Sequence, residues 1–300
     1  MRGFYCIDLW GTPKLTAKQD SKRMTRRTIA IAAALSVLAL GSPLITARAN
    51  PLATQHFNQG NEKYEAGNYQ GAIDDWSKAI EVNPQGAGSY YNRGIAKDKL
   101  GDYQGAIADY AKVIEIYPED ASAYNNRGYA KNKAGDIQGA IADFNKAIEI
   151  NPKYTNAYYN RGNTKRKLKD YQGAIADYTK TIEFDPQYVY AYNNRGTTKG
   201  KSKDYQGAIA DFNKAIEVNP KYASAYYNRG KAKRELKDYQ GAIADYTKAI
   251  EINPQYASAY LNRGIDREIV NDLKGACLDW RKAAGLGKEN AAEWVKNQCS

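Results

Sequence analysis

The chain has 300 residues, and its 44 Lys and Arg against 33 Asp and Glu give a formal net charge of +11. Residues 1–50 hold eight basic and two acidic residues, so they carry +6, and the other 250 residues carry only +5. That modest excess gives no reason to expect a nucleic-acid partner. Three Cys and one His are too few to predict a metal cluster.

Residues 24–49 have the layout of a secretory signal peptide. Arg26 and Arg27 precede a twelve-residue, almost wholly apolar stretch at 29–40, and "ARA" at 47–49 offers the small residues that a signal peptidase needs. The apolar stretch is too short to span a bilayer comfortably. We therefore predict a signal peptide within residues 1–49, with Met24 as an alternative translation start and Asn50 as the first residue of the mature chain.

The export route has alternatives. An uncleaved membrane anchor is the alternative to cleavage, and "TRRTI" weakly resembles a twin-arginine signal. No Cys follows the apolar stretch, which argues against a lipoprotein. The expected location is the periplasm, an equivalent lumen or the exterior, with no stable membrane span after cleavage.

A period of 34 residues then runs through the chain without a gap. The glycine of the recurring "NRG" (or its counterpart) marks it at Gly60, Gly94, Gly128, Gly162, Gly196, Gly230 and Gly264. The period divides residues 53–290 into seven units: 53–86, 87–120, 121–154, 155–188, 189–222, 223–256 and 257–290. We number the residues of each unit from one to 34 and call each number a place, so this glycine holds place eight.

Other places are nearly as constant. Place twenty is always Ala, place 24 is always aromatic, and place 32 is Pro in six units, the last having Lys288. In these residues the chain resembles the tetratricopeptide repeat (TPR) family, which uses small residues at eight and twenty, an aromatic at 24 and Pro at 32. The chain departs from the family at place seven, Arg in all but the first unit, and at place eleven, Lys or Arg. The match is therefore to an NRG subtype, whose partners are not inferred from better-known members.

Each unit reads as two helices. Asp or Asn at place sixteen is the expected cap of the second helix, and places 17, 20, 21, 24, 27 and 28 form its apolar stripe. A glycine inside the first helix indicates a close helix crossing, with Gly and Ala letting two backbones approach. One unit cannot bury its stripe alone. The resemblance implies an all-α, right-handed superhelical solenoid of seven helix–turn–helix units.

Arg at place seven and Asp at place 23 are equally distant from the expected turn, so they should face each other within a unit. Arg–carboxylate forks of this kind set register more than they add stability. The predicted ion pairs are Arg93–Asp109, Arg127–Asp143, Arg161–Asp177, Arg195–Asp211, Arg229–Asp245 and Arg263–Asp279. In the first unit Gln59 is expected to bond Asp75 instead.

Asn at place six points the other way, on a stripe with places two, nine and thirteen that the resemblance puts in the concave groove. This row is similar to the asparagine ladder in the TPR groove of O-linked N-acetylglucosamine transferases, and an amide can match an extended peptide backbone. Its members are Asn58, Asn92, Asn126, Asn160, Asn194, Asn228 and Asn262. The nearby cations are Lys99, Lys133, Lys167 and Lys201, with Arg166, Lys231 and Arg234. They would favour acidic segments or a terminal carboxylate; the alternative is that duplication copied Asn without a use.

No phosphate loop, metal-ligand spacing or nucleophile–base pair occurs, so neither an enzyme nor a cofactor is expected. His56, the single His, stands at place four, where other units have Tyr, and is interpreted as a packing substitute. The first hypothesis is an exported scaffold that binds a peptide or partner protein, as in the assembly of an envelope or membrane complex. The alternatives are a structural protein that stacks end to end, which an uncapped end would permit, and, less well supported, a nucleic-acid binder.

The last residues resemble the start of an eighth unit that stops after one helix. Residues 291–300 are therefore predicted to form the C-terminal capping helix. They lie in the segment 289–299, which has the pattern of an eighth unit with Trp294 at the aromatic place four. Cys277 and Cys299 lie at similar distances from a turn near Gly287, and export would place both in an oxidising compartment. We predict a Cys277–Cys299 disulfide; the alternative is two independent thiols.

Overall fold

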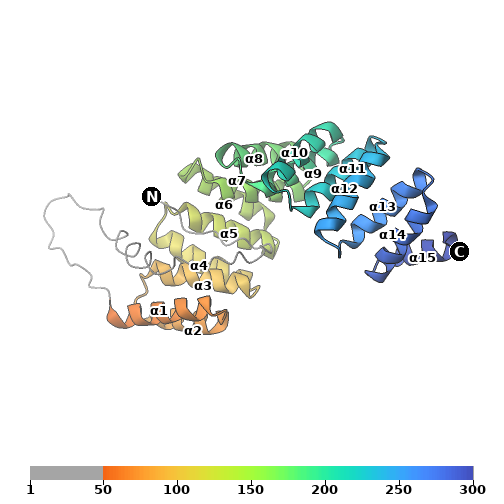
Figure 1. Cartoon of the computed structure of the whole chain (residues 1–300). Helices are drawn as coiled ribbons and strands as arrows, with labels where there is room; N and C mark the ends of the chain where they lie inside the picture. The colour runs from red at the N-terminus through yellow and green to blue at the C-terminus, as the bar shows by residue number, and fades with distance from the viewer. Residues whose placement is uncertain (1–49, 300) are drawn as a thin grey trace. The chain divides into compact units, whose positions relative to one another are not determined.

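The computed structural model of the protein describes residues 50–299 (Figure 1). The predicted signal peptide, the alternative start at Met24 and the residues on the N-terminal side of the cleavage point lie outside the described residues. Asn50, the predicted first residue of the mature chain, caps the first helix, since its Oδ1 accepts a hydrogen bond from the amide of Leu52 at 3.0 Å.

Residues 50–299 form fifteen helices. The first helices of the units are α1 (Pro51–Glu65), α3 (Ala87–Lys99), α5 (Ala121–Ala134), α7 (Thr155–Lys167), α9 (Val189–Lys201), α11 (Ala223–Glu235) and α13 (Ala257–Ile269). The second helices are α2 (Tyr69–Val82), α4 (Tyr103–Ile116), α6 (Ile137–Ile150), α8 (Tyr171–Phe184), α10 (Tyr205–Val218), α12 (Tyr239–Ile252) and α14 (Leu273–Gly285). The last helix is α15 (Glu289–Gln298).

Each helix packs against the one before and the one after it, so the seven helical hairpins stack in chain order (Figure 1). In the middle of the array the first helices also contact each other, α5 with α7, α7 with α9 and α9 with α11. Helices α5, α7, α9 and α11 thus form one continuous face. The all-helical solenoid expected from the 34-residue period is confirmed.

The turn inside each hairpin is built by two constant places. The Asp or Asn at place sixteen accepts a hydrogen bond from the amide of Gly at place nineteen, as in Asp204 and Gly207 at 2.9 Å. A Cβ on Gly207 would collide with the Asp204 carboxylate, so glycine is required there. The residue at place fifteen adopts a positive φ in every unit, and this residue is Lys in Lys169, Lys203 and Lys237.

The interior of each hairpin centres on the aromatic residue at place 24. Tyr178 and Phe144 are fully buried, and the alanines at place twenty have no exposed surface. A Cβ added at Gly128 would lie 2.9 Å from Cε1 of Phe144 and 3.1 Å from the backbone oxygen of Ala140. The glycine at place eight therefore makes room for the aromatic ring as well as for the facing backbone. Only the close approach of the two backbones was expected from the sequence.

Helix α15 closes the C-terminal end of the array. Ala291 is fully buried, and the ring of Trp294 meets that of Trp280 edge-on with centroids 5.3 Å apart. The structure contains the expected Cys277–Cys299 disulfide, with Cα atoms 5.5 Å apart. The last helix is thus fixed by both packing and a covalent bond.

Candidate functional site

The six predicted Arg–Asp ion pairs are all present, each as a two-pronged fork. In the fifth unit Arg195 donates from Nε to Oδ2 of Asp211 at 3.0 Å and from Nη2 to Oδ1 at 2.6 Å. The carboxylate is buried. Equivalent forks join Arg93 to Asp109, Arg127 to Asp143, Arg161 to Asp177, Arg229 to Asp245 and Arg263 to Asp279.

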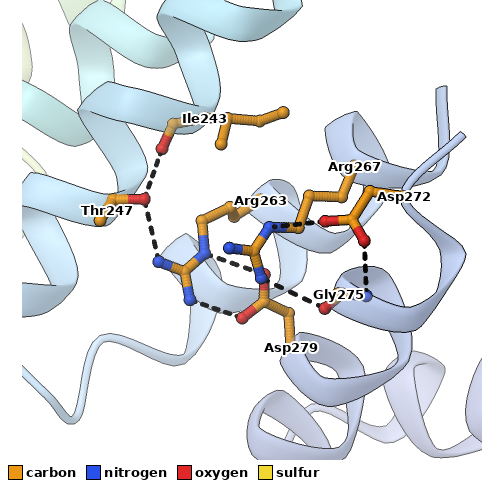
Figure 2. A network of polar contacts seen from close by, with 7 residues as sticks. All are labelled: Ile243, Thr247, Arg263, Arg267, Asp272, Gly275 and Asp279. Carbon is orange, nitrogen blue, oxygen red and sulfur yellow. Dashed lines mark hydrogen bonds and ion pairs between the residues drawn. The ribbon is translucent and has the colours of Figure 1, made fainter. Parts of the chain in front are cut away.

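Each of these carboxylates also pairs with a second cation, at place eleven, that was not expected from the sequence. Lys199 lies 2.9 Å from Oδ2 of Asp211, and in the last unit Arg267 lies 2.9 Å from Asp279 (Figure 2). In the first unit Lys63 pairs with Asp75 at 2.6 Å, and the hydrogen bond expected from Gln59 to Asp75 is absent among the described residues. This second cation could have been predicted from the sequence, because places seven and eleven are four residues apart and share one helix face.

The same arginines also connect neighbouring units. Arg263 donates from Nη1 to the hydroxyl of Thr247, at place 25 of the preceding unit, at 3.0 Å (Figure 2). Ser77, Asn145, Thr179 and Asn213 accept the equivalent bond. Arg127 of the third unit is the exception, because place 25 of the second unit is Ala111, which offers no side-chain acceptor. In the six pairs the guanidinium also lies over the Tyr at place four, 5.5 Å from the ring centre of Tyr90 for Arg93.

The asparagines at place six also bridge units. Asn194 donates to the hydroxyl of Tyr159 and to Oδ1 of Asn163, both at 3.0 Å and both on the preceding first helix. Asn228 donates to Asn193 at 2.9 Å, and the others follow the same pattern with Asn61, Tyr91, Asn125 and Tyr227 as acceptors. Asn58 has no preceding unit and is exposed. Six of the seven predicted groove asparagines therefore have a structural role that was not foreseen, while their part in ligand binding stays a prediction.

The lysines at place thirteen are different, and we call Lys99, Lys133, Lys167 and Lys201 the lysine row. They stand at the ends of α3, α5, α7 and α9, and all but the half-buried Lys99 are exposed. Within residues 50–299 the lysine row takes part in no ion pair, in contrast to the lysines at place eleven. Lys167 instead donates to Oδ1 of Asn132 at 2.8 Å, and Lys133 lies 5.4 Å from the ring centre of Tyr129.

Positive charge is concentrated around Lys167. Partial burial lowers the pKa of the Lys167 amine, and the like charges of Lys133 and Arg166 lower it further. Burial raises the pKa of Tyr178, and the nearby positive charge of Arg166 partly opposes this rise. Among the described residues these three cations form no ion pair, although the Asp98 carboxylate lies within electrostatic reach of Lys133.

Two further predicted groove cations behave differently from each other. Lys231 is exposed, 5.8 Å from the ring centre of Tyr227. Arg234 has internal partners that were not expected: its Nε lies 2.5 Å from Oδ1 of the fully buried Asp266, and its Nη2 donates to the backbone oxygen of Asn262 at 2.7 Å. Its part in the groove stays a prediction. Asp occurs at place ten only in the seventh unit, so the repeat pattern did not predict the pairing of Arg234 with Asp266.

In residues 50–299 there is no group of His, Cys, Asp and Glu side chains that could hold a metal ion. None of the helices there combines the length and apolar character needed to cross a membrane. His56 is partly buried on α1, as a packing side chain at place four would be.

Models of known protein families match most of the repeat array. Sequence models described as tetratricopeptide repeat match residues 57–121, 91–155, 155–188 and 223–256, and one described as TPR repeat matches 201–234. No curated protein matches the chain.

Among solved structures, a crystal structure of the protein MamA is 27% identical over 57% of this chain and 94% of its own, with a TM-score of 0.52. A tetratricopeptide repeat protein from Parabacteroides merdae covers 84% of this chain and 100% of its own, with 22% identity and a TM-score of 0.63. YrrB, described as a TPR protein with an unusual peptide-binding site, covers 61% of this chain and 95% of its own, with 24% identity and a TM-score of 0.52. The last two likenesses concern the fold alone.

Proposed function

Because the chain belongs to the tetratricopeptide repeat proteins, we propose that it is a non-enzymatic scaffold that holds an extended acidic segment of a partner protein against its first helices. Solenoids of helical repeats are typical protein-interaction scaffolds, because stacked units create a long continuous surface. The peptide-binding site named in the description of YrrB supports the same use of the fold.

The observation that carries the proposal is the contrast between two sets of lysines. Lysines at place eleven neutralise a buried carboxylate in six units and have a structural purpose. Lysines of the lysine row have no such partner among the described residues, and they repeat at the same point of four successive units. A ligand with regularly spaced negative charges would meet one lysine per unit.

The asparagines contribute backbone recognition in this proposal. A primary amide has two N–H groups and an oxygen with two lone pairs. Where one N–H bonds the preceding unit, as in Asn228, the second N–H and part of the oxygen's capacity are left for a peptide. The units thus combine charge attraction from the lysine row with amide contacts that do not depend on ligand sequence.

The proposed setting is outside the cytoplasm, in the periplasm, an equivalent lumen or the exterior, with assembly of an envelope or membrane complex as the process. Its support is the signal-peptide pattern in residues 24–49 and the paired cysteines at the end of the array. End-to-end stacking of copies is disfavoured, because α15 covers the C-terminal end on which a second copy would stack.

The direct test is binding of an acidic peptide of about twelve residues, long enough to reach roughly 40 Å when extended. Binding is followed by fluorescence anisotropy for the protein and for the triple variant Lys133→Gln, Lys167→Gln and Lys201→Gln. We expect the triple variant to bind about tenfold more weakly at low salt, with a smaller difference at high salt.

The matched control is Lys146→Gln, Lys180→Gln and Lys214→Gln. These lysines lie on the second helices of the same three units and pair with exposed glutamates, so the net charge changes equally. This control should bind the peptide as the unchanged protein does. Equal weakening in both triple variants would mean that net charge, and not the lysine row, attracts the peptide.

A further inference from the structure

A hollow of about 210 Å³ lies in the first unit, between α1, the end of α2 and the start of α3, at the orange end of the array in Figure 1. It is lined by the ring of Phe57 and by the buried Ala53 and Ala79. Thr54 and Asn83, which also line it, are exposed, so the hollow is accessible from solvent. An apolar cavity of about 150 Å³ binds benzene, so this hollow has room for one aromatic ring.

Other units fill the equivalent space with a tyrosine of their own. Place 34 is Tyr in four successive units, as Tyr154, Tyr188, Tyr222 and Tyr256. The ring of Tyr256 meets that of Tyr227, at place five of its own unit, with centroids 4.8 Å apart. It also packs against the cluster that contains Ala249 at place 27 and Ala259 at place three of the next unit. In the fourth unit Tyr188 makes the same contact with the aromatic ring at place five, at 4.9 Å.

The first unit has the corresponding walls without the tyrosine. Phe57 holds place five, Ala79 holds place 27 and Ser89 holds place three of the next unit, and all three line the hollow. Place 34 is Gly86, whose φ of −77° and ψ of 75° match the −78° and 74° of Tyr256. The backbone therefore follows the same path, and the hollow is the space that a tyrosine side chain occupies elsewhere in the array.

We propose that this hollow binds one aromatic side chain of a partner protein, which takes the position of the tyrosine at place 34 in the other units. Contact with the ring of Phe57 and burial of apolar surface supply the attraction. The Thr54 hydroxyl donates to the backbone oxygen of Asn50 at 3.2 Å, which leaves the lone pairs of its oxygen for a phenol. The site rests on the proposed function only in that its occupant belongs to a partner, since the lysine row begins in the second unit.

The probe for the test is an uncharged five-residue peptide with 4-fluorophenylalanine at its centre, whose ¹⁹F NMR signal is followed as the protein is added. Unlabelled peptides with Tyr, Phe or Ala at the centre then compete with it. We expect the Tyr and Phe peptides to bind about tenfold more tightly than the Ala peptide. Because the probe has no charge, the triple variant Lys133→Gln, Lys167→Gln and Lys201→Gln should bind it unchanged, which separates this site from the lysine row.

Gly86→Tyr gives the first unit the tyrosine of the other units, so it should fill the hollow, abolish probe binding and raise the melting temperature. The matched control is Gly86→Ala, which adds a Cβ without a ring and should bind the probe as the unchanged protein does. The converse variant, Tyr256→Gly, should open an equivalent hollow in the sixth unit and add a second binding site for the probe.

Equal competition by the Tyr and Ala peptides, or unaltered probe binding in Gly86→Tyr, would overturn the proposal. A protein that forms dimers, and that Gly86→Tyr converts to monomers in sedimentation, would also overturn it, because the occupant would then be a second copy of this chain.

Discussion

Removing the buried carboxylate of one unit should destabilise the array far more than removing an exposed one. Asp211 is almost completely buried and accepts from Arg195 at 2.6 and 3.0 Å, with Lys199 2.9 Å away. Asp211→Ala leaves two cations whose side chains are only 16% and 21% exposed. Breaking a buried pair from one side costs 3–5 kcal/mol, and since both cations can turn partly to water we expect about 3 kcal/mol.

The assay is equilibrium unfolding in urea followed by far-UV circular dichroism, with hydrogen exchange of α9 and α10 to locate the loss. The matched control is Glu217→Ala in the same unit, where the carboxylate is 68% exposed and pairs with Lys214, and no measurable change is expected. If stranded cations cause the loss, adding Arg195→Met and Lys199→Met to Asp211→Leu should recover most of it. Equal losses in Asp211→Ala and Glu217→Ala, or no recovery in the triple variant, would refute this reasoning.

Three other predictions concern stability. Ala111→Ser gives Arg127 the acceptor that it lacks, so the free energy of unfolding should rise by about 1 kcal/mol, a hydrogen bond to a charged group outweighing the lower helix propensity of Ser; the gain should vanish in an Arg127→Met background. Lys237→Gly relieves a φ of +63° and should raise the melting temperature by an amount equivalent to about 1 kcal/mol, whereas Gly101→Lys should lower it; no change in either would contradict the cost assigned to this conformation. Cys299→Ser removes a disulfide that joins residues 22 apart, so the free energy of opening α15, measured by hydrogen exchange, should fall by about 3 kcal/mol on the loop-entropy estimate, while α1 to α12 stay unchanged. Unaltered exchange in α15 would mean that packing alone holds the helix.

Contacts within a hairpin could be predicted from the sequence. Arg195 and Asp211 are equally far from a turn marked by Asp204, so helix periodicity alone brings them together. Cys277 and Cys299 were paired by the same counting across the last turn. In both cases the geometry depends only on two helices and the short turn between them.

Contacts between hairpins could not be predicted, because they depend on how far each unit is rotated and shifted against the preceding one. The 34-residue period contains no such information. It therefore did not reveal that Asn228 reaches Asn193, that Arg263 reaches Thr247 or that Arg234 is held by Asp266. The sequence does explain one feature, since place five alternates between Tyr and Asn in units two to six and supplies an acceptor for the asparagine at place six of the following unit.

If an extended acidic segment of a partner lies along the lysine row, site-specific photo-crosslinking in the producing cell should trap it there. A photoreactive residue replaces Lys133, Lys167 or Lys201 in turn, with Lys146, Lys180 and Lys214 as matched positions on the second helices. We expect crosslinks from the three row positions to map in order along one acidic segment of a single partner, and we expect none to that segment from the second-helix positions. Crosslinks to that segment from the second helices, or a segment without acidic residues at the row positions, would show that the lysine row is not the binding surface.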